Sequence, residues 1–273
     1  TISYGVGQAT ARDTVKVAAG TYYEHDIVIN KDITLRGGYD PVSWNFDPFL
    51  NQTVVDAERR GRVLYIIGSP TVEGFTLRNG STAGSGGGVH IAQGSPVLRR
   101  NTIVYNAASF YGGGIYNQSG SPTLEQNTLA FNTAQRGGGL ASRLGTPGVW
   151  NNFIYGNNAS VSGGGIYVDG GALNIWHNTV YSNTAVRGGG VSVEGGAVQI
   201  LNTIVARNTA TDYGGGIFRG GGLLTLDYND VWSNNGGDYG GDVSPGSHSI
   251  SADPLFRDTW ANDLHILEHS PCA

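Results

Sequence analysis

The chain has 273 residues, of which 39% are hydrophobic, 14% are charged and 45 are glycine, a composition that predicts a folded protein dense in turns. The formal net charge is −5, and without a run of basic residues the sequence gives no sign of a nucleic-acid partner. The single Cys272 leaves neither an internal disulfide nor a cysteine zinc site. No stretch reaches the roughly 20 consecutive apolar residues of a membrane-spanning helix.

The first residues carry no targeting signal. Residues 1–11 lack the charged and apolar regions of a signal peptide. The sequence also contains no methionine. We therefore expect a processed form or a fragment of a longer product, with further sequence beyond Ala273.

The N-terminal part, residues 1–73, predicts irregular coils of short strands. Runs rich in Val, Ile and Thr over 13–22, 27–29 and 33–38 are separated by turn residues, as expected for β-strands. Residues 40–56 then interrupt the pattern with Trp, Phe and Pro residues. We interpret this stretch as a loop or lateral insertion.

From residue 74 to residue 243 a signature of three glycines and an aliphatic residue recurs every 25 or 26 residues. Glycine suits a corner because it tolerates positive φ and close approach of neighbouring backbones. A phosphate-binding glycine loop would need one site before a helix, so repeated corners between strands indicate architecture. The six full copies span 86–89, 112–115, 137–140, 163–166, 188–191 and 214–217, and 240–243 is a weakened seventh.

Three further series keep the same period and predict the fold. Asparagine tolerates the left-handed conformation, and its amide can bond the asparagine of the next coil. The aliphatic stretches between the corners predict three short strands per repeat. We therefore predict one all-β domain, a right-handed parallel β-helix (a solenoid) with coils stacked about 4.8 Å apart. The series are Asn106, Asn132, Asn157, Asn183, Asn208 and Asn234; Leu98, Leu124, Val149, Ile175, Ile200 and Leu226; and Ile103, Leu129, Ile154, Val180, Val205 and Val231.

The last residues, 244–273, leave the repeat and are expected to close the helix. Their sequence over 252–256, with His265 and Ser270-Pro271-Cys272, resembles the closing segment of secreted bacterial right-handed β-helix repeat proteins. The opening strands resemble those of pectate-lyase-like and pectinesterase-like β-helix proteins, and the Gly and Asn motifs resemble polymorphic-outer-membrane-protein-like repeats. These resemblances imply a bacterial extracellular or cell-surface protein. They leave its activity open, because this fold hosts lyases, hydrolases, esterases and adhesins.

Outward side chains that align on successive coils are the candidates for function. Asp169 and Glu194 occupy equivalent positions after consecutive glycine signatures, which would place them about one strand spacing apart. Because retaining glycosidases use carboxyl groups about 5 Å apart, the two residues are the candidate catalytic pair. The alternative, which we prefer, is a solvated column in which Arg143 neutralises Asp169.

Two aromatic columns are candidates for substrate binding. Tyr116 and Tyr167 follow glycine signatures two coils apart, and Trp150 and Trp176 are equivalent on adjacent coils. Alternation of inward and outward residues predicts that the Tyr column faces solvent. Together with Arg143, these rings could stack on sugars, although stacking on each other is the structural alternative.

We predict no metal site and no cofactor, with calcium as the alternative. A polysaccharide lyase would need a basic proton acceptor and often calcium held by clustered carboxylates. Asp212, Asp238 and Asp242 are the acidic residues that could hold calcium. Aspartate is also an ordinary turn residue.

Uniform repetition without a dense polar cluster favours a non-enzymatic scaffold at the cell surface, acting in adhesion or assembly and binding glycans or cell-surface or matrix proteins. The alternative is a polysaccharide-processing enzyme, either a lyase or a glycoside hydrolase, or a glycan-binding module. A wall formed by residues 40–56 over Tyr167, Asp169 and Glu194 would favour the enzyme. Because strand edges remain at the ends of a β-helix and neither end shows a clear polar cap, we also expect end-to-end self-association.

Overall fold

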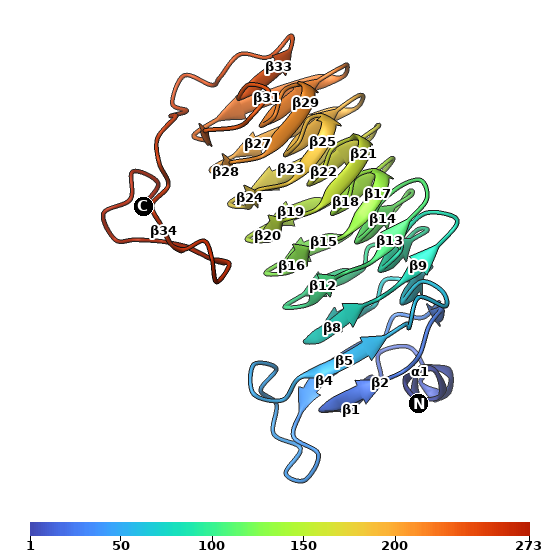
Figure 1. The fold of residues 1–273 in the computed structure, drawn as a ribbon. Helices are drawn as coiled ribbons and strands as arrows, with labels where there is room; N and C mark the ends of the chain where they lie inside the picture. Colours follow the sequence, from blue (N-terminus) through green and yellow to red (C-terminus); the bar gives the residue numbers. More distant parts are fainter.

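The computed structural model describes residues 1–273 and shows a parallel β-helix, as predicted. Successive coils contribute strands to three parallel nine-stranded sheets, named A, B and C here, which confirms the three predicted strands of each coil. Figure 1 shows the coils stacked from the N-terminal helix to β33. We expect the winding to be right-handed, as it is for nearly all parallel crossover connections.

The strands of the three sheets are short and stack in register. Sheet A consists of β1 (Thr14–Ala18), β4 (Thr34–Tyr39), β7 (Thr71–Glu73), β11 (Val97–Arg99), β15 (Thr123–Glu125), β19 (Gly148–Trp150), β23 (Ala172–Trp176), β27 (Ala197–Leu201) and β31 (Leu223–Asp227). Sheet B consists of β2 (Gly20–Tyr22), β5 (Thr53–Asp56), β8 (Phe75–Arg78), β12 (Thr102–Val104), β16 (Thr128–Ala130), β20 (Phe153–Tyr155), β24 (Thr179–Tyr181), β28 (Ile204–Ala206) and β32 (Asp230–Trp232). Sheet C consists of β3 (Ile27–Ile29), β6 (Leu64–Ile66), β10 (Val89–Ile91), β14 (Ile115–Asn117), β18 (Leu140–Ser142), β22 (Ile166–Val168), β26 (Val191–Val193), β30 (Ile217–Arg219) and β33 (Tyr239–Gly241).

A further sheet of six strands, sheet D, lies between sheets B and C along the chain and was not predicted. Its strands precede the glycine signatures, and those from β17 onward end directly before them, so each regular coil gains a fourth short strand and visits sheets A, B, D and C in turn. Sheet D consists of β9 (Ser81–Thr82), β13 (Ala107–Ala108), β17 (Thr133–Arg136), β21 (Asn158–Ser162), β25 (Thr184–Arg187) and β29 (Thr209–Tyr213).

The core is a continuous stack of inward aliphatic side chains, which form one cluster of 39 buried residues. The predicted aliphatic series belong to it. Leu98, Leu124 and Val149 are partners in sheet A, and none of them is more than 1% exposed. Each such side chain contributes about 1.5–3 kcal/mol through burial.

The predicted asparagine series forms a hydrogen-bonded ladder at the corner between sheets B and D. The Nδ2 of Asn157 donates to Oδ1 of Asn183 at 3.0 Å and to the carbonyl oxygen of Leu129 at 2.9 Å. Its own Oδ1 accepts from Nδ2 of Asn132 at 3.0 Å. A second ladder, which we did not predict, stands at the corner between sheets A and B and consists of Asn101, Asn127, Asn152, Asn178, Thr203 and Asn229.

The glycine signature is required by backbone geometry at the corner between sheets D and C. Gly163, the first glycine of its copy, has φ of 67°. A Cβ on Gly164 would lie 2.5 Å from the carbonyl oxygens of Gly189 and Thr184. The prediction that these glycines are corners is confirmed.

The N-terminal end of the β-helix is capped, contrary to our prediction that neither end has a clear cap. Helix α1 (Ile2–Gln8) buries Ile2 and Val6, each 3% exposed, against the core. The ammonium group of Lys31 donates to carbonyl oxygens at the end of α1, including that of Ala9 at 2.6 Å. End-to-end self-association stays a prediction, but α1 occupies one of the two ends. No helix of the structure is long and apolar enough to cross a bilayer.

Two segments project from the coil stack. The first, named the insertion here, comprises residues 40–52 between β4 and β5. The predicted range of 40–56 is shortened because Thr53–Asp56 forms β5 and buries Val55. The second, the C-terminal arm of residues 244–273, contains β34 (Phe256–Asp258) and β35 (Asp263–Ile266), which pair antiparallel. In Figure 1 the arm runs back beside the ends of β20, β24 and β28.

Candidate functional site

The predicted acidic pair lies directly after neighbouring strands of sheet C. Asp169 follows β22 and Glu194 follows β26, and the backbone N–H of Glu194 donates to the carbonyl oxygen of Val168 at 2.8 Å. The two carboxylates accept hydrogen bonds from different hydroxyl groups. The Tyr167 hydroxyl donates to Oδ1 of Asp169 at 3.5 Å, and the Ser192 hydroxyl donates to Oε1 of Glu194 at 3.3 Å. The two carboxylates are thus on adjacent coils, as expected, but each has its own partner.

The tyrosine column of sheet C is covered, so the prediction that it faces solvent is wrong. Tyr116 and Tyr167 are each 5% exposed. Tyr111, which lies just before a glycine signature, packs its ring 5.6 Å from that of Tyr116 and 6.0 Å from that of Tyr167. The guanidinium of Arg136 lies 5.8 Å from the centre of the Tyr111 ring. Residues at the end of sheet D therefore fold over this column.

Burial also fixes the protonation state of these phenols. It raises the pKa of Tyr116, although the positive charge of Arg143 acts in the opposite direction. Burial and the Asp169 carboxylate raise the pKa of Tyr167. Both phenols therefore stay protonated to a higher pH than an exposed tyrosine, and Arg143 itself is exposed at the rim of the column.

The two tryptophans stack on each other on the outer face of sheet A. The ring centroids of Trp150 and Trp176 are 6.3 Å apart, with an interplanar angle of 23°. The indole Nε1 of Trp150 donates to Oε2 of Glu125 at 3.2 Å. Both rings are half-buried, an arrangement that favours the structural role over a sugar platform.

A cleft of about 890 Å³, which we did not predict, lies over sheet B. We name it the sheet B cleft. It lies on a different sheet from Asp169 and Glu194, and the insertion borders it instead of sheet C. The insertion therefore does not form the wall over the acidic pair that would have favoured the enzyme. The cleft is lined by Pro48, Phe49, Gln52, Thr53, Gly74, Phe75, Thr76, Arg100, Asn101, Thr102, Gln126, Thr128, Asn151, Phe153 and His265.

The insertion forms the wall at the N-terminal end of the cleft and is anchored on sheet A. The Phe46 ring packs 5.4 Å from that of Tyr39, and the Arg36 guanidinium lies 5.1 Å from the Phe46 ring centre. Gly38 has φ of 84°, and a Cβ on it would lie 2.7 Å from Pro48. This close approach holds Pro48 against the coil, while the following Phe49 is 83% exposed at the cleft.

The C-terminal arm forms the opposite wall. Leu264 is 3% exposed and packs with Tyr181 and Ala206, and the Phe256 ring lies 5.3 Å from that of Tyr181. The His265 ring contacts Phe153 edge-on, with centroids 5.3 Å apart. The arm is therefore fixed to sheet B by an aromatic cluster.

The floor of the cleft is made of aligned outward residues of β8, β12 and β16. Thr76, Thr102 and Thr128 are register partners and form a row of hydroxyl groups. Two positions further along the strands, Val104 and Ala130 are also partners. The floor thus has a polar row, beside which Val104 is half-buried and Ala130 is fully buried.

Beside this floor, a buried glutamate is hydrogen-bonded to three arginine side chains. Glu73 is 1% exposed and accepts hydrogen bonds from Arg36, Arg99 and Arg100 at 2.9–3.1 Å. Three guanidinium groups on one carboxylate leave a surplus of two positive charges. Arg100 also lines the cleft and donates to Gln126.

A smaller cavity of about 490 Å³ lies under the end of the C-terminal arm. The Cys272 thiol donates to Oδ2 of Asp230 there at 3.1 Å. Burial and the Asp230 carboxylate raise the pKa of Cys272 to about 12, and burial raises the pKa of Asp230. The contact fastens the end of the chain to the last strand of sheet B.

No group of three or more His, Cys, Asp or Glu residues is placed to hold a metal ion. Asp238 instead accepts hydrogen bonds from the backbone and side chain of Asn234. Asp242 is fully exposed at the surface near Arg219. The alternative of a calcium site gains no geometric support from these residues.

Comparison of the chain with protein families, functionally characterised proteins and solved structures finds no match.

Proposed function

We propose that this chain binds a polysaccharide in the sheet B cleft and acts as a non-catalytic β-helix module at a cell surface or in the extracellular space. The observation that carries this proposal is the chemistry of the cleft. Its floor offers hydroxyl and amide groups, the insertion offers the aromatic side chain of Phe49, and β20 offers that of Phe153 where it meets the arm. A sugar ring has the same mixture, with hydroxyl groups at its edge and C–H groups on its faces.

The dimensions of the cleft suit an extended chain. The floor crosses β8, β12, β16 and β20, which are three coil steps, or about 14 Å at the usual strand spacing. One sugar unit of an extended polysaccharide advances by a length similar to one coil step. A stretch of about three sugar units that lies along the helix axis between the two walls would therefore meet one Thr hydroxyl per sugar ring.

Binding is favoured over hydrolysis by the positions of the acidic residues. Glycosidases place two carboxyl groups beside the bond that they cleave, and the lining of the sheet B cleft includes neither Asp nor Glu. Asp169 and Glu194 lie on sheet C, where hydroxyl groups of their own coils engage them.

The proposed extracellular or cell-surface location rests on the resemblance of the sequence motifs to those of other β-helix proteins. The opening strands and the Gly and Asn motifs are similar to those of pectate-lyase-like and polymorphic-outer-membrane-protein-like β-helix proteins, which supports a bacterial extracellular or surface location. A module of this kind could serve as the adhesive scaffold that we expected from the uniform repeat.

Catalysis by Asp169 and Glu194 is the second candidate function, and their position on adjacent coils favours it. Release of new reducing ends from a polysaccharide, abolished by Glu194→Gln, would establish a glycoside hydrolase and remove the non-catalytic proposal. We expect no release.

The proposal is tested by replacing the hydroxyl row with methyl groups of the same shape. We expect the double variant Thr102→Val with Thr128→Val to bind polysaccharide roughly tenfold more weakly, because two hydrogen bonds are lost at about 0.5–1.5 kcal/mol each. Isothermal titration against a panel of neutral and acidic polysaccharides measures the change.

The matched control is Thr133→Val, which changes an exposed threonine of sheet D and should leave affinity unchanged. Equal affinity of the double variant and the natural chain, or absence of binding to every polysaccharide of the panel, would contradict the proposal.

A further inference from the structure

The rim of sheet B next to the cleft carries an exposed aromatic pair. Tyr105 and Phe131 directly follow β12 and β16, and they are 54% and 37% exposed. Their rings are stacked, with centroids 5.4 Å apart and an interplanar angle of 10°. Both residues follow strands whose threonines line the cleft, and the pair stands outside the cleft lining at the far end of these strands.

Their backbone conformation is unfavourable for aromatic residues. Tyr105 has φ of 57° and Phe131 has φ of 55°, a region that bulky side chains rarely occupy. The equivalent corner positions of the neighbouring coils share the positive φ but carry no aromatic residue. They are Asn79, Gly156, Ser182, Arg207 and Ser233. Among these corners, the aromatic pair occurs only at the two that follow β12 and β16.

The neighbouring coil holds the pair rigidly. The Tyr155 ring contacts Phe131 edge-on, with centroids 5.4 Å apart. A Cβ at Gly156 would lie 2.7 Å from Phe131, so the glycine leaves room for the ring. On the other side, Asn79 is bonded to Asp56 at 3.0 Å, and no other aromatic ring contacts Tyr105. The stack thus ends on Tyr105.

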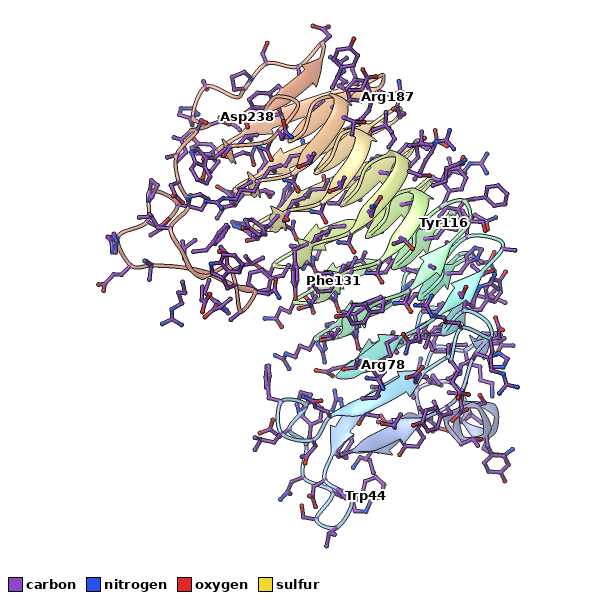
Figure 2. All side chains as sticks on the ribbon, viewed as in Figure 1. Trp44, Arg78, Tyr116, Phe131, Arg187 and Asp238 are labelled. Atoms are coloured by element: carbon purple, nitrogen blue, oxygen red, sulfur yellow. The ribbon has the colours of Figure 1, made fainter.

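We propose that Tyr105 and Phe131 form a sugar platform that selects β-linked chains of equatorially substituted hexopyranose units. This inference rests on the proposed polysaccharide binding and names the ligand class. Two parallel rows lie on the outer side of these strands: the hydroxyl groups of Thr102 and Thr128, and, past Val104 and the buried Ala130, the aromatic pair. Phe131 lies on a different flank of the coil stack from the covered Tyr116 (Figure 2).

The hydroxyl row and the aromatic pair match the amphipathic shape of such a chain. A hexopyranose with equatorial substituents has hydroxyl groups around its edge and two flat C–H faces, and β-linkage keeps successive rings in an extended ribbon. The ribbon can place hydroxyl edges on the threonine row while a ring rests on the aromatic pair. A chain of α-linked glucose coils instead and cannot follow both rows over consecutive turns of the β-helix.

The test compares cello-oligosaccharides with malto-oligosaccharides, which contain the same sugar in β- and α-linkage. We expect the natural chain to bind the β-linked series at least about tenfold more tightly by titration calorimetry. Tyr105→Ala should weaken this binding about fivefold to tenfold, as loss of one aromatic contact does, while Tyr105→Phe should retain it.

The matched control is Tyr213→Ala, which removes a tyrosine that is 59% exposed on sheet D and should change nothing. Thermal unfolding of each variant verifies that it is folded. Equal affinity for the two series, or unchanged affinity in Tyr105→Ala, would overturn the platform.

The threonine variants separate this failure from that of the proposed function. If Thr102→Val with Thr128→Val weakens polysaccharide binding while Tyr105→Ala does not, the platform is wrong and the cleft stands. If the natural chain binds no member of the polysaccharide panel and neither oligosaccharide series, both proposals fall.

Discussion

The coil stack and the two segments that project from it are stabilised in different ways. Within the stack, each residue of a ladder or core column contacts its equivalents on the neighbouring coils. Asn157, for example, is hydrogen-bonded to Asn132 and Asn183. The insertion and the C-terminal arm have no equivalents. They are held by contacts that occur once in the molecule, such as Phe46 on Tyr39 and Leu264 on Tyr181. Repetition therefore sets stability, while the non-repeated segments shape the cleft.

The largest expected effect is on the stack. Asn157→Ala removes the donor to Leu129 and Asn183 and the acceptor for Asn132, which leaves several buried polar groups unpaired. We expect the free energy of unfolding to fall by about 3 kcal/mol or more. Denaturant unfolding measures it, with the exposed neighbour Asn158→Ala as a control that should stay within about 0.5 kcal/mol. Similar losses for both variants would break the distinction between ladder and surface.

A more local effect, confined to the arm, is expected from a change in its packing on sheet B. Leu264→Ala removes a side chain that is 3% exposed, at a cost of about 2–5 kcal/mol for a buried leucine. Because the arm is not part of the repeat, we expect it to detach while the stack stays folded. Limited proteolysis should then cut within 251–270 and polysaccharide affinity should drop. Cleavage throughout the coils at the same rate would show that the arm and the stack unfold as one unit.

The smallest effect is a pH dependence at the end of the arm. The pKa of Cys272 is raised to about 12 by burial and by Asp230, whereas an unfolded cysteine titrates near 8.5. Between these values the folded chain keeps a proton that the unfolded chain loses, so stability should fall as pH rises from about 9 toward 12. Cys272→Ser should flatten this fall in thermal unfolding, and an unchanged slope would contradict the assigned contact.

Much of the stack could be predicted because its causes repeat. The inward positions of Leu98 and Leu124, the bonds along the asparagine ladder and the corners at Gly163 and Gly164 each follow from the local sequence at a fixed period. The second ladder was also visible, at Asn101, Asn127, Asn152, Asn178 and Asn229. The threonine row at 76, 102 and 128 keeps the same spacing, and it was the available signal for the cleft floor.

The features that the sequence did not predict depend on contacts between residues that are distant in the chain. Tyr116 and Tyr167 were expected in solvent because alternation describes one strand, whereas Tyr111 and Arg136 cover them from the end of sheet D. The walls of the cleft come from residues 40–52 and 244–273, which meet sheet B through tertiary packing alone. Because these segments lie outside the repeat, its periodicity does not predict where they pack.

Hydrogen–deuterium exchange of the backbone amides, with and without a bound polysaccharide, tests the central claim most directly. The account predicts slower exchange on ligand binding at 48–53, 100–105, 126–131 and around His265, all beside the sheet B cleft, with no change at 167–169 or 192–194. Protection confined to the segments around Asp169 and Glu194 would contradict it and place the ligand on sheet C.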